Sequence, residues 1–452
     1  MGLQKENKMG VMPINKLLLT MSLPMMASML VMALYNVVDS IFVSRYSSDA
    51  LTAVTLAFPY QNLMIAVATG TGVGVNALLS KSLGEKKFEK ATKVANNAIF
   101  LAIVSFVVFV LLGLTTAEPF FRLQIQDETI IRYGADYFWI CSVFSFGVFG
   151  AICFERLLVS TGKTVLTMVC QLTGAITNII LDPIFIFGLL GVPSMGVSGA
   201  AIATVIGQIA EMILAAILNI KCNREVKLSF KRIFSPSLHI IKQIYAVGLP
   251  SILMASIGSV MTFCMNKILG SFKEIENIAI NIFGIYFKIQ SFIFMPVFGL
   301  NNGMVPIVAY NYGAKCRARV TKTIRLSMFY AVGIMLVGLL IFQIFPEFLF
   351  SIFNSDSGEL VRYGCRAFRI ISLNFIIAGF CIVASSVFQA LGNGVYSLIV
   401  SLARQLGILV PVAYLLSLFG NIDLVWIAFP IAETVSAVLC LIFFKKSLKK
   451  ID

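Results

Sequence analysis

Charged residues are scarce in this sequence of 452 residues. Asp, Glu, Lys and Arg make up 12% of the chain, roughly half the share found in soluble globular domains. Histidine occurs once and tryptophan twice, while 59% of the residues are hydrophobic. A soluble fold has no means of covering that much apolar surface. The composition therefore excludes a soluble globular protein and predicts a chain embedded in a lipid bilayer.

Paired cysteine and histidine motifs are also missing. The nine cysteines are scattered and include no Cys-x-x-Cys pair, so neither a disulfide framework nor a zinc site is indicated. His239, the single histidine, lies in a basic loop and is expected to be solvated. No HExxH or GxSxG set appears, which argues against the alternative of an intramembrane enzyme. We therefore expect no enzymatic activity, no bound metal and no cofactor.

Long apolar runs recur along the whole chain. A helix needs about 20 apolar residues to cross the roughly 30 Å hydrocarbon core of a bilayer. The first run is too long for the apolar core of a signal peptide, so a retained span is expected there. We predict an all-α polytopic membrane protein with twelve transmembrane helices, over 17–44, 51–80, 94–116, 134–160, 166–190, 197–220, 244–270, 278–312, 326–345, 366–391, 396–418 and 425–444.

The basic residues are distributed unevenly between the two sets of loops. The formal net charge is +14, and most of the 35 Lys and Arg residues fall in the N-terminal segment, the C-terminal tail and every second loop. Cytoplasmic loops of membrane proteins carry such an excess of Lys and Arg. We therefore expect both termini in the cytoplasm. The positive charge orients the protein in the membrane, and no nucleic-acid partner is implied.

Short motifs recur at a spacing of about half the chain. At offsets of 226 to 230 residues, the recurring motifs are Arg132-Tyr133-Gly134 with Arg362-Tyr363-Gly364, Leu23-Pro24 with Leu249-Pro250, Gly84 with Gly313, and Gly162 with Gly392. Six spans in each half give both halves the same orientation, as in alternating-access transporters built from parallel repeats. We predict an N-terminal lobe over 1–225 and a C-terminal lobe over 226–452, each with six transmembrane helices.

Three carboxylates stand out inside the predicted spans of the first half, namely Asp39, Glu155 and Asp182. A charge at the bilayer centre costs about 2.5–3.5 kcal/mol even on the lenient insertion scale, so such residues usually face a cavity and are functional. In the fifth predicted span, Gln171, Asn178 and Asp182 stand at i, i+7 and i+11. This spacing brings the three side chains to nearly one helical face.

The two aspartates are predicted to form a proton or cation site. Tyr35 and Asn36 precede Asp39 by four and three residues and share its helical face. If the first and fifth spans are neighbours, Tyr35, Asp39, Asn178 and Asp182 form one hydrogen-bonded cluster. Two carboxylates in a low-dielectric pocket repel each other, so one of them can bind a proton near neutral pH. The alternatives are a helix cap at Asp39 and a simple helix break at Asp182.

Glu155 is predicted to contact a cationic substrate from the cytoplasmic half of the fourth span. Asp182, Asn36 and Gln171 are the other predicted substrate-binding residues. The neighbouring Arg156 points about 100° away around the helix, so it is poorly placed to neutralise Glu155. The alternative is a structural ion pair or a residue near the membrane surface.

The second half contains fewer acids within its spans, and Glu433 is the clearest of them. The alternative transporter is a flippase for a lipid-linked saccharide. Its anionic substrate would require a cavity lined with basic residues. Arg366 and Arg369 begin the tenth predicted span beside an outer loop. The other basic residues inside the predicted spans are Arg156, Lys267, Lys288 and Arg404. The acids of the first half favour a cationic substrate over this alternative.

These features together resemble the multidrug and toxic compound extrusion (MATE) family. The resemblance rests on the two six-span halves and on three segments: NVVDSIFV over 36–43, NIILDP over 178–183 and GVSGAA over 196–201. It extends over essentially the whole chain. Within the family, the sequence is similar to the DinF-type and MepA-type bacterial branch.

The resemblance implies a V-shaped, twelve-helix transporter in the bacterial plasma membrane that exports organic cations in exchange for H⁺ or Na⁺. It places the family's coupling residues on Tyr35, Asp39, Asn178 and Asp182, and the glutamate of the MepA-like pattern on Glu155. The additional acids of the NorM-type branch, in spans seven and ten, are missing here. Their absence favours H⁺ over Na⁺. A monomer in contact with small organic cations and membrane lipids is expected.

Overall fold

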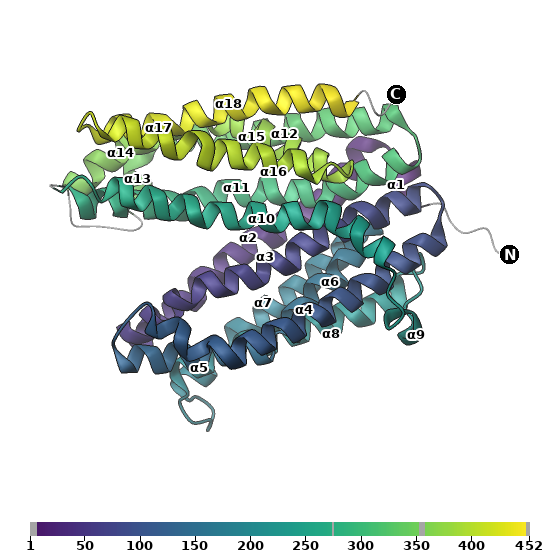
Figure 1. Ribbon diagram of the computed structural model, residues 1–452, viewed down its shortest axis with the longest axis horizontal. Coiled ribbons are helices and arrows are strands. Elements are labelled where there is room, and N and C mark those ends of the chain that lie inside the picture. The colour runs from purple at the N-terminus through teal and green to yellow at the C-terminus, as the bar shows by residue number, and fades with distance from the viewer. Residues whose placement is uncertain (1–6, 274, 352–357, 449–452) are drawn as a thin grey trace.

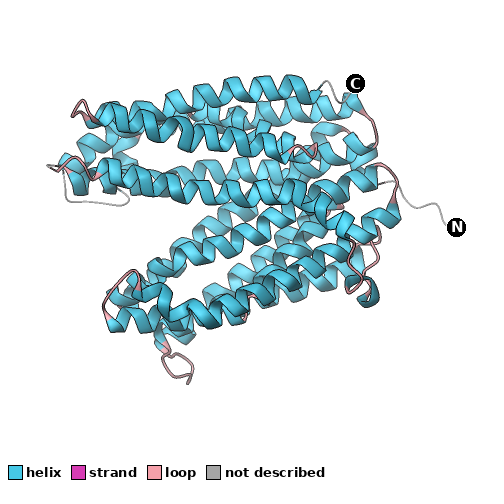
Figure 2. Cartoon of the chain, viewed as in Figure 1, coloured by secondary structure: helices cyan, strands magenta, loops and turns pink. Residues whose placement is uncertain are grey.

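The computed structural model describes residues 7–273, 275–351 and 358–448. The regular elements in these ranges are all helices, with no strand (Figure 2). Among the described residues, ten helices are long and apolar enough to cross a membrane, and two bent pairs raise the number to twelve when each pair is counted as one span. The predicted all-α fold with twelve transmembrane helices is confirmed.

The helices form two bundles, one from each half of the sequence (Figure 1). The N-terminal half contains α1 (Lys8–Val11), α2 (Ile14–Tyr46), α3 (Ser48–Gly84), α4 (Phe88–Arg122), α5 (Glu128–Val143), α6 (Phe146–Ser160), α7 (Thr164–Phe187) and α8 (Gly196–Cys222). The short helix α9 (Phe230–Ile233) lies in the connection to the C-terminal half. The C-terminal half contains α10 (Leu238–Leu269), α11 (Glu276–Gly313), α12 (Arg317–Ile344), α13 (Pro346–Ser351), α14 (Gly358–Ser372), α15 (Phe375–Ala390), α16 (Gly394–Leu402), the π-helix η1 (Ala403–Leu409), α17 (Val410–Ser417) and α18 (Ile422–Leu448).

The two bundles converge near the chain termini and diverge at the opposite end, so the molecule has the shape of a V (Figure 1). We call the converging end the closed end. The predicted lobe boundary at 225/226 falls in the connection between α8 and α10, which contains α9. The bent pairs are α5 with α6, at 46°, and α14 with α15, at 50°.

The backbone of one half repeats that of the other at its turns. Gly162 and Gly392 have φ angles of 86° and 84°, in the left-handed region that glycine adopts without steric penalty. Lys86 and Lys315 have φ angles of 58° and 56°, in the same left-handed region, which residues other than glycine adopt only rarely. Lys86 follows the helical hairpin α2–α3, and Lys315 follows the equivalent hairpin α10–α11. The internal repeat therefore extends to the local backbone conformation.

Glycines bring the two bundles into backbone contact toward the closed end. α3 packs on α10 and α11, and α2 packs on α11. At six glycines of these helices, an added Cβ atom would overlap the partner helix. The absence of a side chain at these positions allows the helices to approach closely. The contacts are Gly70 with Ile252, Gly299 with Met26, Gly74 with Ile244 and Gly248, Gly303 with Ser22, Gly84 with Tyr310, and Gly313 with Lys81.

The short helix α1 is held between the bundles at the closed end. Nδ2 of Asn7 donates to the carbonyl of Thr161 in the N-terminal bundle at 3.1 Å. From the C-terminal bundle, the Arg319 guanidinium donates to the carbonyls of Met9 and Met12, at 3.0 and 2.8 Å. Met9 is fully buried. Hydrogen bonds from both bundles therefore hold α1 in place.

Arg319→Ala is expected to release α1 from the C-terminal bundle, because the partly buried carbonyls of Met9 and Met12 lose their charged donor. A cysteine placed at Met9, in a background where the exposed Cys222 and Cys316 are serine, reports this release. Its modification by a water-soluble maleimide should speed up at least about tenfold, as expected for local opening. The control is Lys322→Ala, at an exposed position of the same helix. An unchanged rate in Arg319→Ala would contradict the role of Arg319.

Candidate functional site

Two aspartates meet inside the N-terminal bundle, Asp39 on α2 and Asp182 on α7. Their carboxyl groups lie within hydrogen-bonding reach of each other, and Asp182 is fully buried. Two charged carboxylates repel strongly where water is excluded, so carboxyl groups approach this closely when one of them carries a proton. The arrangement can therefore hold one shared proton.

Asn178 and Thr204 fix the position of Asp182. In the amide orientation that satisfies its neighbours, the Asn178 nitrogen donates to Asp182 at 3.0 Å. The Asn178 oxygen then accepts from the backbone N–H of Thr204 at 3.1 Å and from its hydroxyl at 3.3 Å. The hydroxyl of Tyr35 also reaches Thr204. The structure thus brings Tyr35, Asp39, Asn178 and Asp182 into one polar network, joined by Thr204 of α8, which the sequence analysis did not identify.

A second pair of acids lies between α6 and α8. Glu155 is buried, with 5% of its surface exposed, and its carboxyl group is within hydrogen-bonding reach of Glu211. Nε2 of Gln171, on α7, donates to Oε2 of Glu155 at 3.0 Å. Arg156 is directed elsewhere and donates to Oδ1 of Asn302 in the C-terminal bundle at 3.1 Å. Glu155 is thus paired with another acid, and a proton shared between the two glutamates relieves their repulsion.

The polar face of α7 connects the two acid pairs. Gln171 contacts the glutamate pair, whereas Asn178 and Asp182 belong to the aspartate cluster. The 11 residues from Gln171 to Asp182 correspond to about 16 Å along a helix.

Asn36, a predicted substrate-binding residue, is exposed on α2, and its side chain makes no hydrogen bond to either pair within the described ranges.

Sequence reasoning missed Glu211. This residue stands in the middle of the predicted sixth span, so the signal used for the other three acids, a carboxylate within an apolar run, was present there too. Its proximity to Glu155 follows from the packing of α6 against α8. The roles of the acids in binding and coupling stay predictions.

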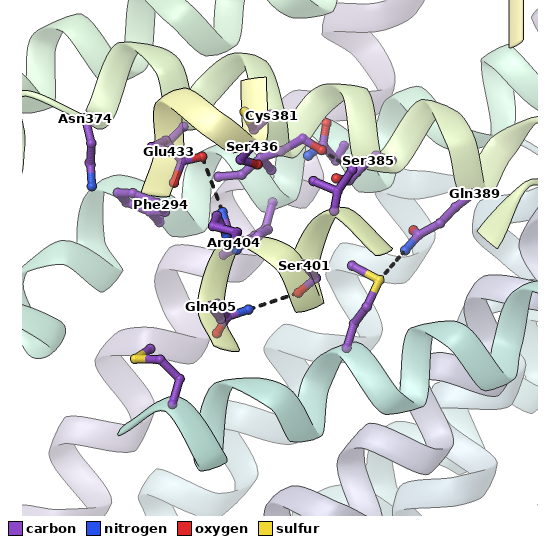
Figure 3. Close-up of a pocket in the computed structure, with 18 of the residues that line it drawn as sticks. Phe294, Asn374, Cys381, Ser385, Gln389, Ser401, Arg404, Gln405, Glu433 and Ser436 are labelled. Atoms are coloured by element: carbon purple, nitrogen blue, oxygen red, sulfur yellow. Dashed lines mark hydrogen bonds and ion pairs between the residues drawn. The ribbon is translucent and has the colours of Figure 1, made fainter. Parts of the chain in front are cut away.

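A cavity of about 430 Å³ lies mainly inside the C-terminal bundle (Figure 3). In its wall, Nη1 of Arg404 lies 3.4 Å from Oε1 of Glu433. Arg156 reaches the cavity from the N-terminal bundle. Neither the aspartate pair nor the glutamate pair lines this cavity, so the structure contains acid clusters and a large cavity in separate places.

The comparisons with known proteins agree with this architecture. The MatE family profile matches residues 24–184 and 250–415. The multidrug export protein MepA of Staphylococcus haemolyticus is 26% identical over 428 residues, which cover 94% of this chain and 92% of MepA. The FAD transporter of Shewanella oneidensis is 25% identical over 434 residues, which cover 95% of this chain and 94% of that protein.

A solved structure shows the same fold. The outward-facing conformation of a multidrug resistance MATE family transporter of the MOP superfamily superimposes with a TM-score of 0.92 at 25% identity. The superposition covers 100% of this chain and 99% of the other. Because the family profile matches long segments of both halves, and both bundles superimpose together, the chain belongs to the MatE family of membrane transporters.

Proposed function

We propose that this transporter exports cationic amphiphilic compounds from a bacterial cell in exchange for protons. The similarity to MepA, a multidrug export protein, supports the drug-export part of the proposal. The observation that carries proton coupling is the Asp39–Asp182 pair, with its two carboxyl groups within hydrogen-bonding reach inside a membrane-spanning bundle. H⁺ is the proposed coupling ion, and Na⁺ is the alternative.

Antiport follows when the proton and the cationic substrate exclude each other. When the aspartate pair is deprotonated, its negative charge in a low-dielectric bundle attracts a cation. When a proton binds, that attraction weakens and the substrate can leave. The protein therefore releases the substrate only after it takes up a proton. This order couples the flux of substrate in one direction to the flux of protons in the other.

The proposed direction of transport follows from the charge distribution. Basic loops flank the closed end, where both termini lie (Figure 1). With this end in the cytoplasm, the V opens outward, as in the outward-facing MATE transporter that it resembles. Alternating access then requires the bundles to separate at the closed end and approach each other at the outer end.

Ethidium uptake into energised inside-out vesicles tests the coupling ion. Export from the cell corresponds to uptake into these vesicles. Collapse of ΔpH alone should stop uptake while an imposed Na⁺ gradient remains. Loss of uptake on collapse of the Na⁺ gradient alone would make Na⁺ the coupling ion. Uptake that survives both treatments would rule out ion antiport.

Glu155 and Glu211 are proposed to receive the positive charge of the substrate near the closed end. A desolvated organic cation needs a negative partner, because an unpaired buried charge is costly. Glu155→Gln is expected to lower the affinity for dications at least about tenfold and the affinity for monocations less, as expected for the loss of one charge-assisted contact. Neutral apolar ligands should bind almost as before. Affinities of the purified protein in detergent for a set of such ligands provide the measurement.

Glu211→Gln is the matched variant, because the two glutamates face each other. The same order of effects is expected from it, with dications affected most. If Glu155→Gln lowers the affinities for dications, monocations and neutral ligands equally, Glu155 has a structural role. The charged group of the substrate then binds elsewhere in the protein.

A further inference from the structure

The connection between the two bundles exposes apolar side chains at the closed end. Phe230 and Phe234 of this connection are 79% and 54% exposed, and Leu238, the first residue of α10, is 75% exposed. The centroids of the two phenyl rings lie 4.9 Å apart, so the rings form one surface. We call these three side chains the linker patch. Single exposed hydrophobic residues are ordinary, whereas a group of them indicates a surface for a membrane or another molecule.

Two buried asparagines of α4 hold this connection in place. Nδ2 of Asn96 donates to the carbonyl of Lys227 at 2.9 Å, and its Oδ1 accepts from the backbone N–H of Ser229 at 3.0 Å. Oδ1 of Asn97 accepts from the backbone N–H of Ser237 at 2.9 Å. Both asparagines are at most 2% exposed, and buried hydrogen bonds are costly to break. The segment is therefore fixed to the N-terminal bundle on both sides of the linker patch.

The linker patch lies in a strongly basic segment. Between positions 221 and 242 the one acid is Glu225, and its carboxylate lies 2.6 Å from Nζ of Lys163. Lys231 directly follows Phe230 in α9. The exposed basic residues of this segment are Lys221, Arg224, Lys227, Lys231, Arg232 and Lys242. A surface that combines phenyl rings with positive charge complements a partner that is both apolar and negatively charged.

The position of the linker patch favours a lipid bilayer as this partner. The connection begins where α8 ends and ends where α10 begins, and both helices are long and apolar enough to cross a membrane. Figure 1 shows α9 at the closed end, where it packs on α4. Aromatic side chains concentrate at membrane–water interfaces, and clustered Lys and Arg residues bind anionic lipid headgroups. A bilayer surface therefore meets both requirements at the place where the patch lies.

We propose that the linker patch, together with Lys227 and Lys231, binds anionic phospholipids of the leaflet that surrounds the closed end. The phenyl rings insert between the lipids, and the two lysines contact phosphate groups. Because Asn96 and Asn97 fix this segment to α4, the lipid contact also acts on the orientation of the N-terminal bundle in the membrane. The contact requires neither a substrate nor an ion gradient, so it can fail without the proposed export function, and the reverse also holds.

Tryptophan fluorescence of the full-length protein in lipid nanodiscs tests this contact. Phe230→Trp places a fluorescent ring in the linker patch, and the signal of the parent protein, from Trp139 and Trp426, is subtracted. The nanodiscs contain phosphatidylglycerol and phosphatidylcholine in equal amounts, with bromine on the acyl chains of one lipid or the other. Brominated phosphatidylglycerol should quench the added fluorescence at least about twofold more strongly than brominated phosphatidylcholine, because basic side chains concentrate anionic lipid around them.

Phe419→Trp is the matched control. Phe419 is 74% exposed and lies in the turn between α17 and α18, at the diverging end of the V. Neither Lys nor Arg occurs between positions 405 and 444. The two brominated lipids should therefore quench the fluorescence of this variant to the same extent.

Lys227→Gln/Lys231→Gln, introduced into the Phe230→Trp protein, should remove the preference for phosphatidylglycerol while both lipids still quench, because the rings stay in the membrane. Arg232 is left unchanged, since its guanidinium lies 3.4 Å from Glu89. A preference that survives the loss of both lysines overturns their role. Equal quenching by the two lipids in Phe230→Trp overturns the preference for anionic lipid, and the absence of quenching by either lipid overturns the membrane contact.

Discussion

Asp182→Asn is expected to reduce proton-driven efflux to the level of vesicles that lack the protein. The amide can neither bind nor release a proton, and it removes a negative charge that attracts the cation after proton release. Both halves of the antiport cycle therefore fail together. Ethidium uptake and drug-induced proton release, followed with a pH-sensitive dye in the same inside-out vesicles, provide the two measurements.

Asn is close to Asp in size, so membrane insertion and the amount of protein should be unchanged, and an immunoblot of the vesicles checks both. Asp39→Asn is the matched variant on the partner helix. If the two aspartates share one proton, the pH profile of efflux in Asp39→Asn shifts toward lower pH, because Asp182 no longer has a negative neighbour. Normal efflux from Asp182→Asn at equal expression would remove this residue from the mechanism. An unshifted profile in Asp39→Asn would show independent sites.

Gly74→Ala is expected to part the two bundles at the closed end. The added Cβ would overlap the backbone carbonyl of Ile244 on α10, and a helix backbone cannot rotate aside as a flexible side chain can. Overpacking of this kind typically destabilises by about 1–3 kcal/mol. Since about 1.4 kcal/mol corresponds to a tenfold change in an equilibrium, the population should shift strongly toward conformations that are open at this end.

A cysteine at Ser22 reports that opening. Ser22 is 1% exposed, and its hydroxyl donates to the carbonyl of Leu300 across the two bundles at 3.1 Å. Its reaction with a water-soluble maleimide should become at least about tenfold faster in Gly74→Ala. Gly333→Ala on α12 is the control, because a Cβ there meets no atom of the described residues within 4 Å. Equal reaction rates in the two variants would show that the glycine contact does not control opening.

Apolar length predicted the spans, but it did not predict that two of them bend. The breaks between α5 and α6 and between α14 and α15 contain neither proline nor glycine. Each contains one short polar residue, Ser145 or Asn374, of a type common at helix N-caps, and Ser and Asn also occur inside the spans of this chain. Local sequence does not distinguish the two cases, because packing against neighbouring helices decides where such a helix bends.

Helical spacing was sufficient to place Gln171, Asn178 and Asp182 on one face of α7, because the period of a helix is fixed. The partners of that face were harder to predict. Glu211 meets Glu155 through the packing of α6 on α8, and no local pattern encodes which helices pack together. Thr204 was missed for the same reason, since a threonine in an apolar span carries no signal until its neighbours are known.

The reciprocal glycine contacts between the bundles have the geometry of a twofold-symmetric subunit interface. Gly84 meets Tyr310, and Gly313 meets Lys81. Lys81 and Tyr310 are themselves equivalent positions, because each precedes the glycine of its own half by three residues. In an isologous dimer, residue i of one subunit contacts residue j of the other, and j contacts i. The junction of the lobes therefore has the form that two copies of one six-helix chain would make.

That form has an evolutionary consequence. A six-helix protein with this surface could have paired with a second copy of itself in the same membrane orientation before the two copies were joined in one chain. While the copies were identical, every substitution changed both sides of the interface at once. After fusion, each side became free to change alone. Gly248 and Ser22, which occupy equivalent positions against Gly74 and Gly303, are one place where the two sides have already diverged.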